Sequence, residues 1–399
     1  MRIAALERFA DPSRRCEPAL VRGPGDDLET FDLPDGRRTP VAFAGALPGA
    51  LRDWLRVPRT SVERRSLLRA CLATGGARAG ALLRAPGLLE RLRRGDIDAI
   101  ACHSTSGFAL AGALARAAGL PCREALARGT RYFGEFAFEL LAVVPYAYWL
   151  HRQGRLEQTA STADTRCLYY FSPRHVEHAG ARRYVPITEY PIGRPGRWRY
   201  DASSFPAELD TSRWHPPPYK DVYRDERYTW SKPTCVVCNK ATDEYYRWHR
   251  APTNVLEVDL LLSVIGRLRE RYQVVYVRPR RDDIVVDHQP THEIGDHEAI
   301  ARAYPDVLTI QRLRARHPEL GYNELQLRLF AGCERFVSVL GGSAYLASWF
   351  GGVNVVYARR GWEVDCGAYE RWFDRFSGAR VVAAATPQAL LSTIDRELV

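Results

Sequence analysis

Lysine and methionine are scarce in this sequence of 399 residues. There is one methionine, and the only lysines are Lys220, Lys232 and Lys240, so arginine supplies nearly all of the positive charge. The abundance of Ala, Arg and Gly is typical of a GC-rich genome, and codon usage explains part of the arginine excess. The formal net charge of +10 still favours anionic partners such as nucleotides, phosphates, nucleic acid or a membrane surface.

Long hydrophobic runs are also missing. The most apolar segment, Phe136–Leu150, is too short to cross a bilayer and contains Glu139 and Pro145. No secretory signal is visible at the N-terminus. We therefore expect a cytoplasmic protein and leave open a peripheral association with a membrane.

Several diagnostic motifs are missing as well. Neither GxxxxGK[ST] nor GxGxxG occurs, which argues against a P-loop or a dehydrogenase-type site. The absence of RNA-binding modules and zinc-finger spacings argues against a nucleic-acid partner. The histidines form no HExxH, and Asp96-Ile-Asp98 precedes an expected strand instead of ending it, so no metal site and no cofactor are expected.

Cysteine occurs nine times, an odd number that favours reduced thiols and a cytosolic compartment. Cys235-x-x-Cys238 has no second pair elsewhere in the chain. A zinc or redox site is one interpretation of these two residues. A buried strand is the interpretation that we favour, because their neighbours are apolar.

The length and the hydrophobic content of 46% are those of a folded protein with two domains. We predict an N-terminal α/β domain over residues 1–230 and a second α/β domain over residues 231–399. Residues 190–230, rich in Pro, Arg, Trp and Tyr, would form the connector.

Strand and helix patterns alternate through the second domain, which predicts a doubly wound parallel sheet. Its centre is a strand–turn–helix–strand unit in which Gly341-Gly342-Ser343 joins Phe336–Leu340 to a short apolar helix. A glycine turn of this kind either only reverses the chain or lets a phosphate approach the backbone. The expected strands are residues 234–238, 273–277, 307–310, 336–340, 353–358 and 380–383.

Three loops follow strands of this sheet and should meet at its carboxyl edge, where such sheets bind ligands. Asn239-Lys240 could present a point charge, Arg278 to Arg281 could bind phosphate in a bidentate manner, and Ser343 could cap its helix or donate to a phosphate. Each residue also has a surface or capping explanation. Together they predict a phosphate site comprising Asn239, Lys240, Arg278, Arg281, Gly341, Gly342 and Ser343.

The N-terminal half contains another strand–loop–helix pattern, in which residues 96–102 lead into His103 and an alanine-rich helix. Further on, Gly134 precedes a helical apolar pattern that carries Glu135 and Glu139 on one face. Acids in so apolar a segment are costly unless they face solvent, arginine or a ligand.

With these residues the chain resembles the two-domain, GT-B type of nucleotide-sugar glycosyltransferase. Its last domain is similar to the donor domains of fucosyl- and heptosyltransferases, through Cys238-Asn-Lys240 and the strand–Gly-Gly-Ser–helix unit. DIDAIACHSTSGFALAGALARAAGLP, residues 96–121, looks like part of an acceptor domain, and GEFAFEL, residues 134–140, is similar to a loop-to-helix turn at the cleft. The basic cluster at Arg278–Arg281 lies on the second strand of the domain, whereas the similar motif of GDP-fucose-using enzymes lies on the first.

The resemblance implies two Rossmann-like domains that face a cleft and close on a nucleotide-sugar donor. It implies metal-independent, inverting transfer of a sugar to a glycan or another hydroxyl acceptor, with Glu135, Glu139 or His103 as the base. Three alternatives remain open: a nucleotide-sugar epimerase of the same fold, a non-catalytic nucleotide-binding protein, and a basic nucleic-acid-binding module.

Overall fold

The computed structural model describes residues 129–182, 213–246, 249–284, 291–365, 367–371 and 373–399, together with Arg94 and four strands in the first 124 residues. The chain divides into two compact units. One comprises Met1–Gly129 with Thr188–Trp198, and the other comprises Thr130–Ile187 with Arg199–Val399. This division groups residues 130–187 with the C-terminal part of the chain, and the domain boundary between residues 230 and 231 stays a prediction.

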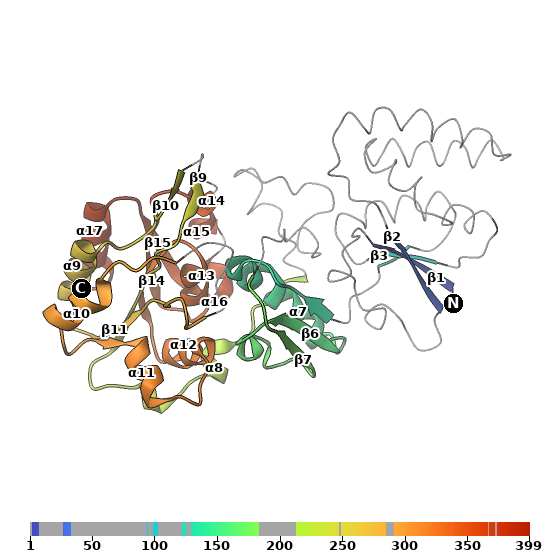
Figure 1. Ribbon diagram of the computed structural model, residues 1–399, viewed down its shortest axis with the longest axis horizontal. Coiled ribbons are helices and arrows are strands. Elements are labelled where there is room, and N and C mark those ends of the chain that lie inside the picture. Colours follow the sequence, from blue (N-terminus) through green and yellow to red (C-terminus); the bar gives the residue numbers. More distant parts are fainter. Residues whose placement is uncertain are drawn as a thin grey trace. The chain divides into compact units, whose positions relative to one another are not determined.

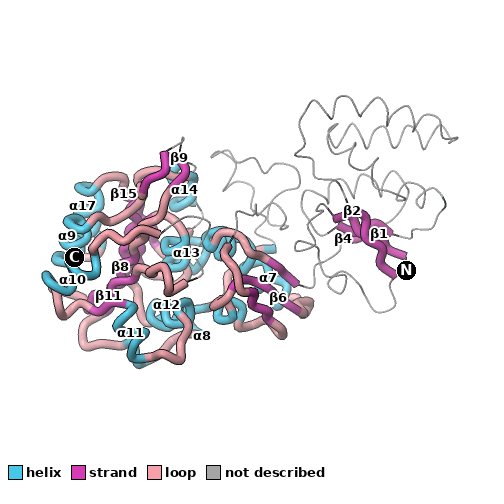
Figure 2. Tube along the Cα trace, in the orientation of Figure 1, coloured by secondary structure: helices cyan, strands magenta, loops and turns pink. Residues whose placement is uncertain are grey.

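The first unit contains a parallel sheet of four strands in the order β2-β1-β3-β4 (Figure 2). Strand β3 falls inside the segment 96–102, where the sequence predicts a strand. The predicted loop with His103 and the helix after it lie outside the described residues. The strands are β1 (Arg2–Glu7), β2 (Asp27–Asp32), β3 (Ala99–Cys102) and β4 (Cys122–Glu124).

The second unit is built on a six-stranded sheet whose order is β12-β11-β8-β13-β14-β15. All its ladders are parallel, so each crossover returns the chain to the same edge of the sheet. Both sheets are parallel, and the α/β class predicted from the sequence is confirmed. The six strands are β8 (Thr234–Cys238), β11 (Gln273–Val277), β12 (Leu308–Thr309), β13 (Arg335–Val339), β14 (Val353–Tyr357) and β15 (Arg380–Ala384).

The central strands are apolar because helices cover both faces of the sheet. All five residues of β8 are buried, which confirms the strand interpretation of the Cys235–Cys238 segment. Figure 1 shows α9, α10 and α17 on one side of the sheet and α12, α13 and α16 on the other. These helices are α9 (Val258–Leu268), α10 (Asp296–Ala303), α12 (Tyr322–Ala331), α13 (Gly342–Ser348), α16 (Asp374–Ser377) and α17 (Pro387–Glu397).

A smaller three-stranded sheet, in the order β5-β6-β7, precedes the large one in the second unit. It accompanies a continuous helical segment that starts at Phe136 and ends at Arg152, with one π-helical turn inside it. Pro145 is the second residue of α7 and lies inside this continuous segment, where it cannot donate to the preceding turn; the Leu141 carbonyl, four residues earlier, accepts the indole N–H of Trp214 at 2.6 Å. The elements are β5 (Gly129–Arg131), α6 (Phe136–Phe138), the π-helical turn Glu139–Val143, α7 (Val144–Arg152), β6 (Gln158–Thr162) and β7 (His175–His178).

Tertiary contacts overrule a local pattern at the segment 166–172, for which the sequence predicts a strand. Arg166–Tyr169 is a 3-10 helix. The hydroxyls of Tyr219 and Tyr223 donate to the carbonyl groups of Leu168 and Cys167, each at 2.6 Å. These carbonyl groups are therefore satisfied without a neighbouring strand.

Asp164, two residues after β6, connects the small sheet to α12, because it forms two hydrogen bonds with Asn323 in the first turn of that helix. Its carboxylate accepts the backbone N–H of Asn323 at 2.9 Å, and its own carbonyl accepts the Asn323 side-chain amide at 2.6 Å. Its φ of 61° lies in the left-handed region, which aspartate and asparagine tolerate better than most residues. Burial raises the pKa of Asp164 to about 6.

We predict that Asp164→Asn makes the free energy of unfolding less dependent on pH. Because the pKa of Asp164 is higher in the folded than in the unfolded chain, the folded state holds the proton more tightly. The free energy of unfolding therefore falls as the pH rises from about 4 to about 6, by roughly 2–3 kcal/mol by pH 7. Asparagine keeps the left-handed turn and an acceptor for Asn323, so the variant should lack this component.

The measurement is the denaturant-unfolding free energy of the variant minus that of the wild type, at pH 4 and at pH 7. We expect this difference to become more positive as the pH rises, because contributions from the other groups cancel in the subtraction. A difference that stays constant would show that the Asp164 carboxyl titrates alike in the folded and unfolded chains.

Candidate functional site

The carboxyl ends of β8, β13 and β14 lie next to one another, because these strands are neighbours in the sheet. The chain leaves β8 on one side of the sheet centre and β13 on the other, so the topological switch point lies between them. In doubly wound sheets ligands bind outside the carboxyl ends of the strands at this switch point. The residues at these three ends, Lys240, Gly341, Gly342, Arg359 and Arg360, form what we call the strand-end cluster.

Lys240 lies against the backbone of Gly341, across the switch point. A Cβ atom on Gly341 would lie 3.0 Å from Lys240 Nζ, and the φ of Gly341, +117°, is one that other residues rarely adopt. The sequence predicted that these two residues would meet, and the structure brings them together. Lys240 Nζ also forms an ion pair of 2.6 Å with the buried carboxylate of Glu244.

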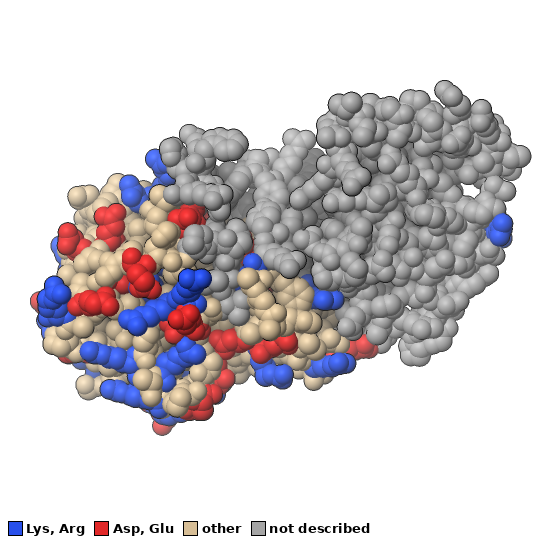
Figure 3. Space-filling model, viewed as in Figure 1, with Lys and Arg blue, Asp and Glu red and all other residues tan. Residues whose placement is uncertain are grey.

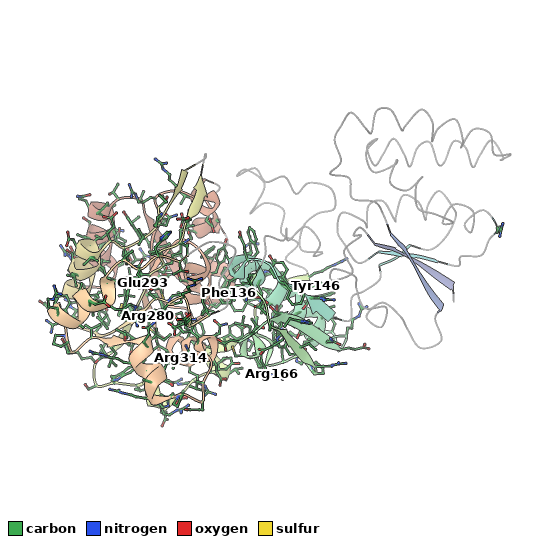
Figure 4. The ribbon with its side chains drawn as sticks, viewed as in Figure 1. Phe136, Tyr146, Arg166, Arg280, Glu293 and Arg314 are labelled. Atoms are coloured by element: carbon green, nitrogen blue, oxygen red, sulfur yellow. The ribbon has the colours of Figure 1, made fainter. Side chains whose placement is uncertain are left out.

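The small size of Gly342 leaves room for another group to approach its backbone, and a side chain of the protein itself occupies that space. A Cβ atom here would lie 2.9 Å from a ring carbon of Phe136, the first residue of α6, which Figure 4 labels. The small glycine therefore serves the packing of α6 on α13. Ser343 does not cap α13, because Gly341 is the capping residue and the Ser343 hydroxyl donates to the carbonyl of Val339 at 3.2 Å.

Asn239, predicted to contact phosphate, is buried and fully engaged with its own chain. Its side-chain oxygen accepts the N–H groups of Lys240 and Leu256, at 3.0 and 2.9 Å. Its amide nitrogen donates to the Leu256 carbonyl and to the Tyr276 hydroxyl. This arrangement favours a structural role, in which Asn239 fixes the end of β8 and the backbone of Lys240.

Arg278 ends β11 as expected, but its guanidinium is completely buried in an ion-pair network. It binds both oxygens of Asp296, at 2.5 and 2.7 Å, and one oxygen of Glu293 at 2.9 Å. These contacts hold α10 to the sheet and favour a structural role over phosphate binding. Arg281 is exposed in the next turn, on the far side of β8 from the switch point.

The two candidate acids on α6 and the π-helical turn lie in contrasting surroundings. Glu139 is completely buried, and Arg182 donates to one of its oxygens at 2.7 Å. Ser161 and Tyr169 donate to the other oxygen, at 2.5 and 2.8 Å. Glu135 is partly exposed and directly precedes Phe136, the residue that touches Gly342. Of these two acids, Glu135 is therefore the one next to a residue that contacts the strand-end cluster, whereas Glu139 is part of the framework.

Several residues of the site were missed from the sequence. Arg359 and Arg360 are exposed at the end of β14, and the rule that singled out Lys240 would have found them. Glu363 lies near Lys240, accepts the hydroxyl of Tyr345 at 3.1 Å, and has a pKa raised by burial. No local signal marks Glu363, because its burial depends on the folding of α14 (Trp362–Asp365) onto the sheet edge.

Charges of both signs occur at this site, since Glu244 and Glu363 lie near Lys240. Figure 3 shows Lys and Arg side chains interspersed with Asp and Glu over the described part of the visible face. Among the residues that the structure describes, no group of three or more His, Cys, Asp or Glu is arranged to hold a metal ion. Metal independence stays a prediction. Within the same residues, no helix combines the length and hydropathy that a membrane span requires.

The second unit is thus of the doubly wound α/β class, with basic and glycine residues at its switch point. No protein-family model matches the sequence, and no curated protein matches it. Among solved structures, E. coli ADP-heptose LPS heptosyltransferase II is similar, with 13% identity, a TM-score of 0.39, and coverage of 68% of this chain and 98% of that one.

Two further solved structures are similar over large parts of both chains. A family 9 glycosyl transferase from Veillonella parvula is 8% identical with a TM-score of 0.40, covering 68% of this chain and 89% of that one. The UDP-GlcNAc 2-epimerase from Neisseria meningitidis, bound to UDP-GlcNAc, is 10% identical with a TM-score of 0.31, covering 99% and 91%. Two of these three proteins are glycosyltransferases by name and the third is a nucleotide-sugar epimerase.

We predict that Glu139→Ala destabilises the protein by about 3–5 kcal/mol, because it leaves the buried Arg182 without the carboxylate it binds. The double variant Glu139→Leu, Arg182→Met removes both charges and should lose less stability than the single one. Denaturant unfolding of both variants measures this. If Glu139→Ala unfolds like the wild type, the ion pair is not part of the framework.

Proposed function

We propose that the chain is a glycosyltransferase, and that the strand-end cluster binds the diphosphate of a nucleotide-sugar donor. The observation that carries the proposal is the position of Lys240, which lies against Gly341 at the switch point of a parallel sheet. A protonated lysine and a glycine turn at this point suit an anion that lies close to the backbone. Arg359 and Arg360, two strands away, extend the positive charge along the same edge.

Charge supplied by lysine and arginine suits a metal-independent reaction. When a sugar leaves its nucleotide, negative charge grows on the diphosphate, and fixed positive groups stabilise it. We propose inverting transfer to a glycan or another hydroxyl acceptor, with no cofactor. Location in the cytoplasm, with or without contact to a membrane surface, remains part of the proposal.

A base must take the proton of the acceptor hydroxyl in this reaction. We propose Glu135, because it is partly exposed and lies at the start of α6, where Phe136 packs on the glycine turn. Glu139 is a weaker candidate, since both of its oxygens already accept hydrogen bonds inside the protein.

We predict that one or more nucleoside diphosphates raise the melting temperature of the wild type, because binding to the folded state alone stabilises it. Lys240→Ala should weaken this binding roughly 10-fold or more, through the loss of a charge-assisted contact to phosphate. A panel of nucleoside diphosphates and nucleotide sugars in thermal-shift and calorimetric titrations tests both statements.

Lys220→Ala is the matched control. Lys220 pairs with Glu334, the residue before β13, so it lies at the opposite, amino end of the sheet. Its replacement should leave nucleotide affinity unchanged. Equal losses in the two variants would point to a general charge effect, and no binding by the wild type would refute the donor site.

We predict that Glu135→Gln lowers the rate of sugar transfer about 100-fold or more while leaving donor affinity near that of the wild type, because an amide cannot accept the proton. The measurement is kcat together with the dissociation constant of the donor, once the panel has identified it. Unchanged turnover would exclude Glu135 as the base. Donor turnover without any acceptor would instead indicate an epimerase.

A further inference from the structure

Lys240 is held by a second set of contacts that reaches two other segments of the sheet edge. Its ion-pair partner Glu244 begins β9 (Glu244–Tyr246), which pairs with β10 (His249–Ala251) in an antiparallel hairpin after β8. The Glu244 side chain is only 5% exposed. A carboxylate buried to this extent normally has both oxygens engaged, and the contacts of Glu244 show this.

Each oxygen of Glu244 accepts from a different donor. Oε1 is 2.6 Å from Lys240 Nζ, and Oε2 accepts the side-chain amide of Asn254 at 2.7 Å. Both positions require an acceptor, so a carboxylate satisfies them where an amide cannot. α9 begins at Val258, four residues further along the chain, so Asn254 does not cap this helix.

Asn254 connects this carboxylate to the arginine pair. Its amide nitrogen donates to the carbonyl of Arg360 at 2.8 Å as well as to Glu244. Its oxygen accepts the N–H of Arg359 at 2.8 Å and that of Arg360 at 3.4 Å. These contacts fix the orientation of the amide, because exchanging its oxygen and nitrogen would oppose like groups at every contact.

We infer that Glu244 is a positioning residue that joins Lys240 to the Arg359–Arg360 turn, so that the ends of β8 and β14 form one anion site. Glu244 keeps the ammonium beside Gly341, and Asn254 holds the backbone of the arginine pair to the same carboxylate. The inference rests on the proposed function. Glu244 and Asn254 set the spacing between the basic groups that would bind a diphosphate.

An opposite role would be competition, in which Glu244 merely occupies Lys240 until a phosphate displaces it. Displacement would leave a buried carboxylate without its cation, which is costly. The ammonium group has three N–H donors, and two remain for a phosphate when one binds Glu244. Positioning therefore fits the burial of Glu244 better than competition does.

The test compares variants of the full chain by calorimetric titration with inorganic pyrophosphate and with the nucleoside diphosphate that the panel selects. Glu244→Gln should weaken both affinities about tenfold, because its amide opposes that of Asn254. Asn254→Ala breaks the same connection from its other side and should cause a similar loss, and the double variant Glu244→Gln, Asn254→Ala should lose little more than either single variant. Glu334→Gln, which alters the exposed partner of Lys220, is the control and should have no effect.

Hydrogen exchange supplies a second measurement that needs no ligand. The backbone amides of Arg359 and Arg360 should exchange faster in Glu244→Gln than in the wild type, and at the wild-type rate in Glu334→Gln. Melting temperatures measured without ligand identify any variant that fails to fold. If Glu244→Gln does not fold, Asn254→Ala tests the same connection from its other side, with the same expected loss of affinity.

Each outcome decides between specific statements. Unchanged affinity in Glu244→Gln overturns the inference, and tighter binding overturns it in favour of competition. Losses that add up in the double variant assign Glu244 a role through its charge alone and refute the connection through Asn254. If the wild type binds neither pyrophosphate nor any nucleoside diphosphate, the proposed function fails, and the inference fails with it.

Discussion

The parallel order of the six-stranded sheet is the constraint on which the rest of the second unit depends. Because every crossover returns to the same edge, polar residues that are far apart in the chain follow adjacent strands. Lys240 and Gly341 meet for this reason, although about a hundred residues separate them. Apolar strands covered by helices on both faces leave this edge as the place where charged groups can gather without entering the core.

Most polar groups at this edge already have partners within the protein. Asn239, Arg278 and Glu139 are buried, and each makes several hydrogen bonds within the protein. Such groups are costly to disturb, which suits a rigid frame. Lys240 and Glu135 are partly exposed, and the arginine pair after β14 is exposed. A site for an anion beside an acid is the chemistry that this division of roles supports best.

The sequence predicted much of the second unit, because its strands are short apolar runs separated by helices with clear periodicity. It located Lys240, Gly341 and Gly342 of the strand-end cluster, but it did not separate ligand-binding from structural roles, since the same arginine can bind a ligand or a carboxylate. Arg278 and Asp296 are 18 positions apart, and Glu139 and Arg182 are 43 apart, so no local pattern identified them as pairs. The prediction of a strand at residues 166–172 was wrong for a similar reason, because tyrosines distant in the sequence donate hydrogen bonds to the carbonyl groups of this segment.

By itself the sequence determined the α/β class, the six strands of the large sheet, and the glycine turn at its switch point. These depend on side-chain size and periodicity, which act over a few residues. Only the tertiary structure decided that Lys240 pairs with Glu244, that Phe136 rather than a ligand fills the space beside Gly342, and that Asn254 binds the Arg359–Arg360 turn. Such pairings form because each buried polar group needs a hydrogen-bond partner, and the whole fold decides which partner is within reach.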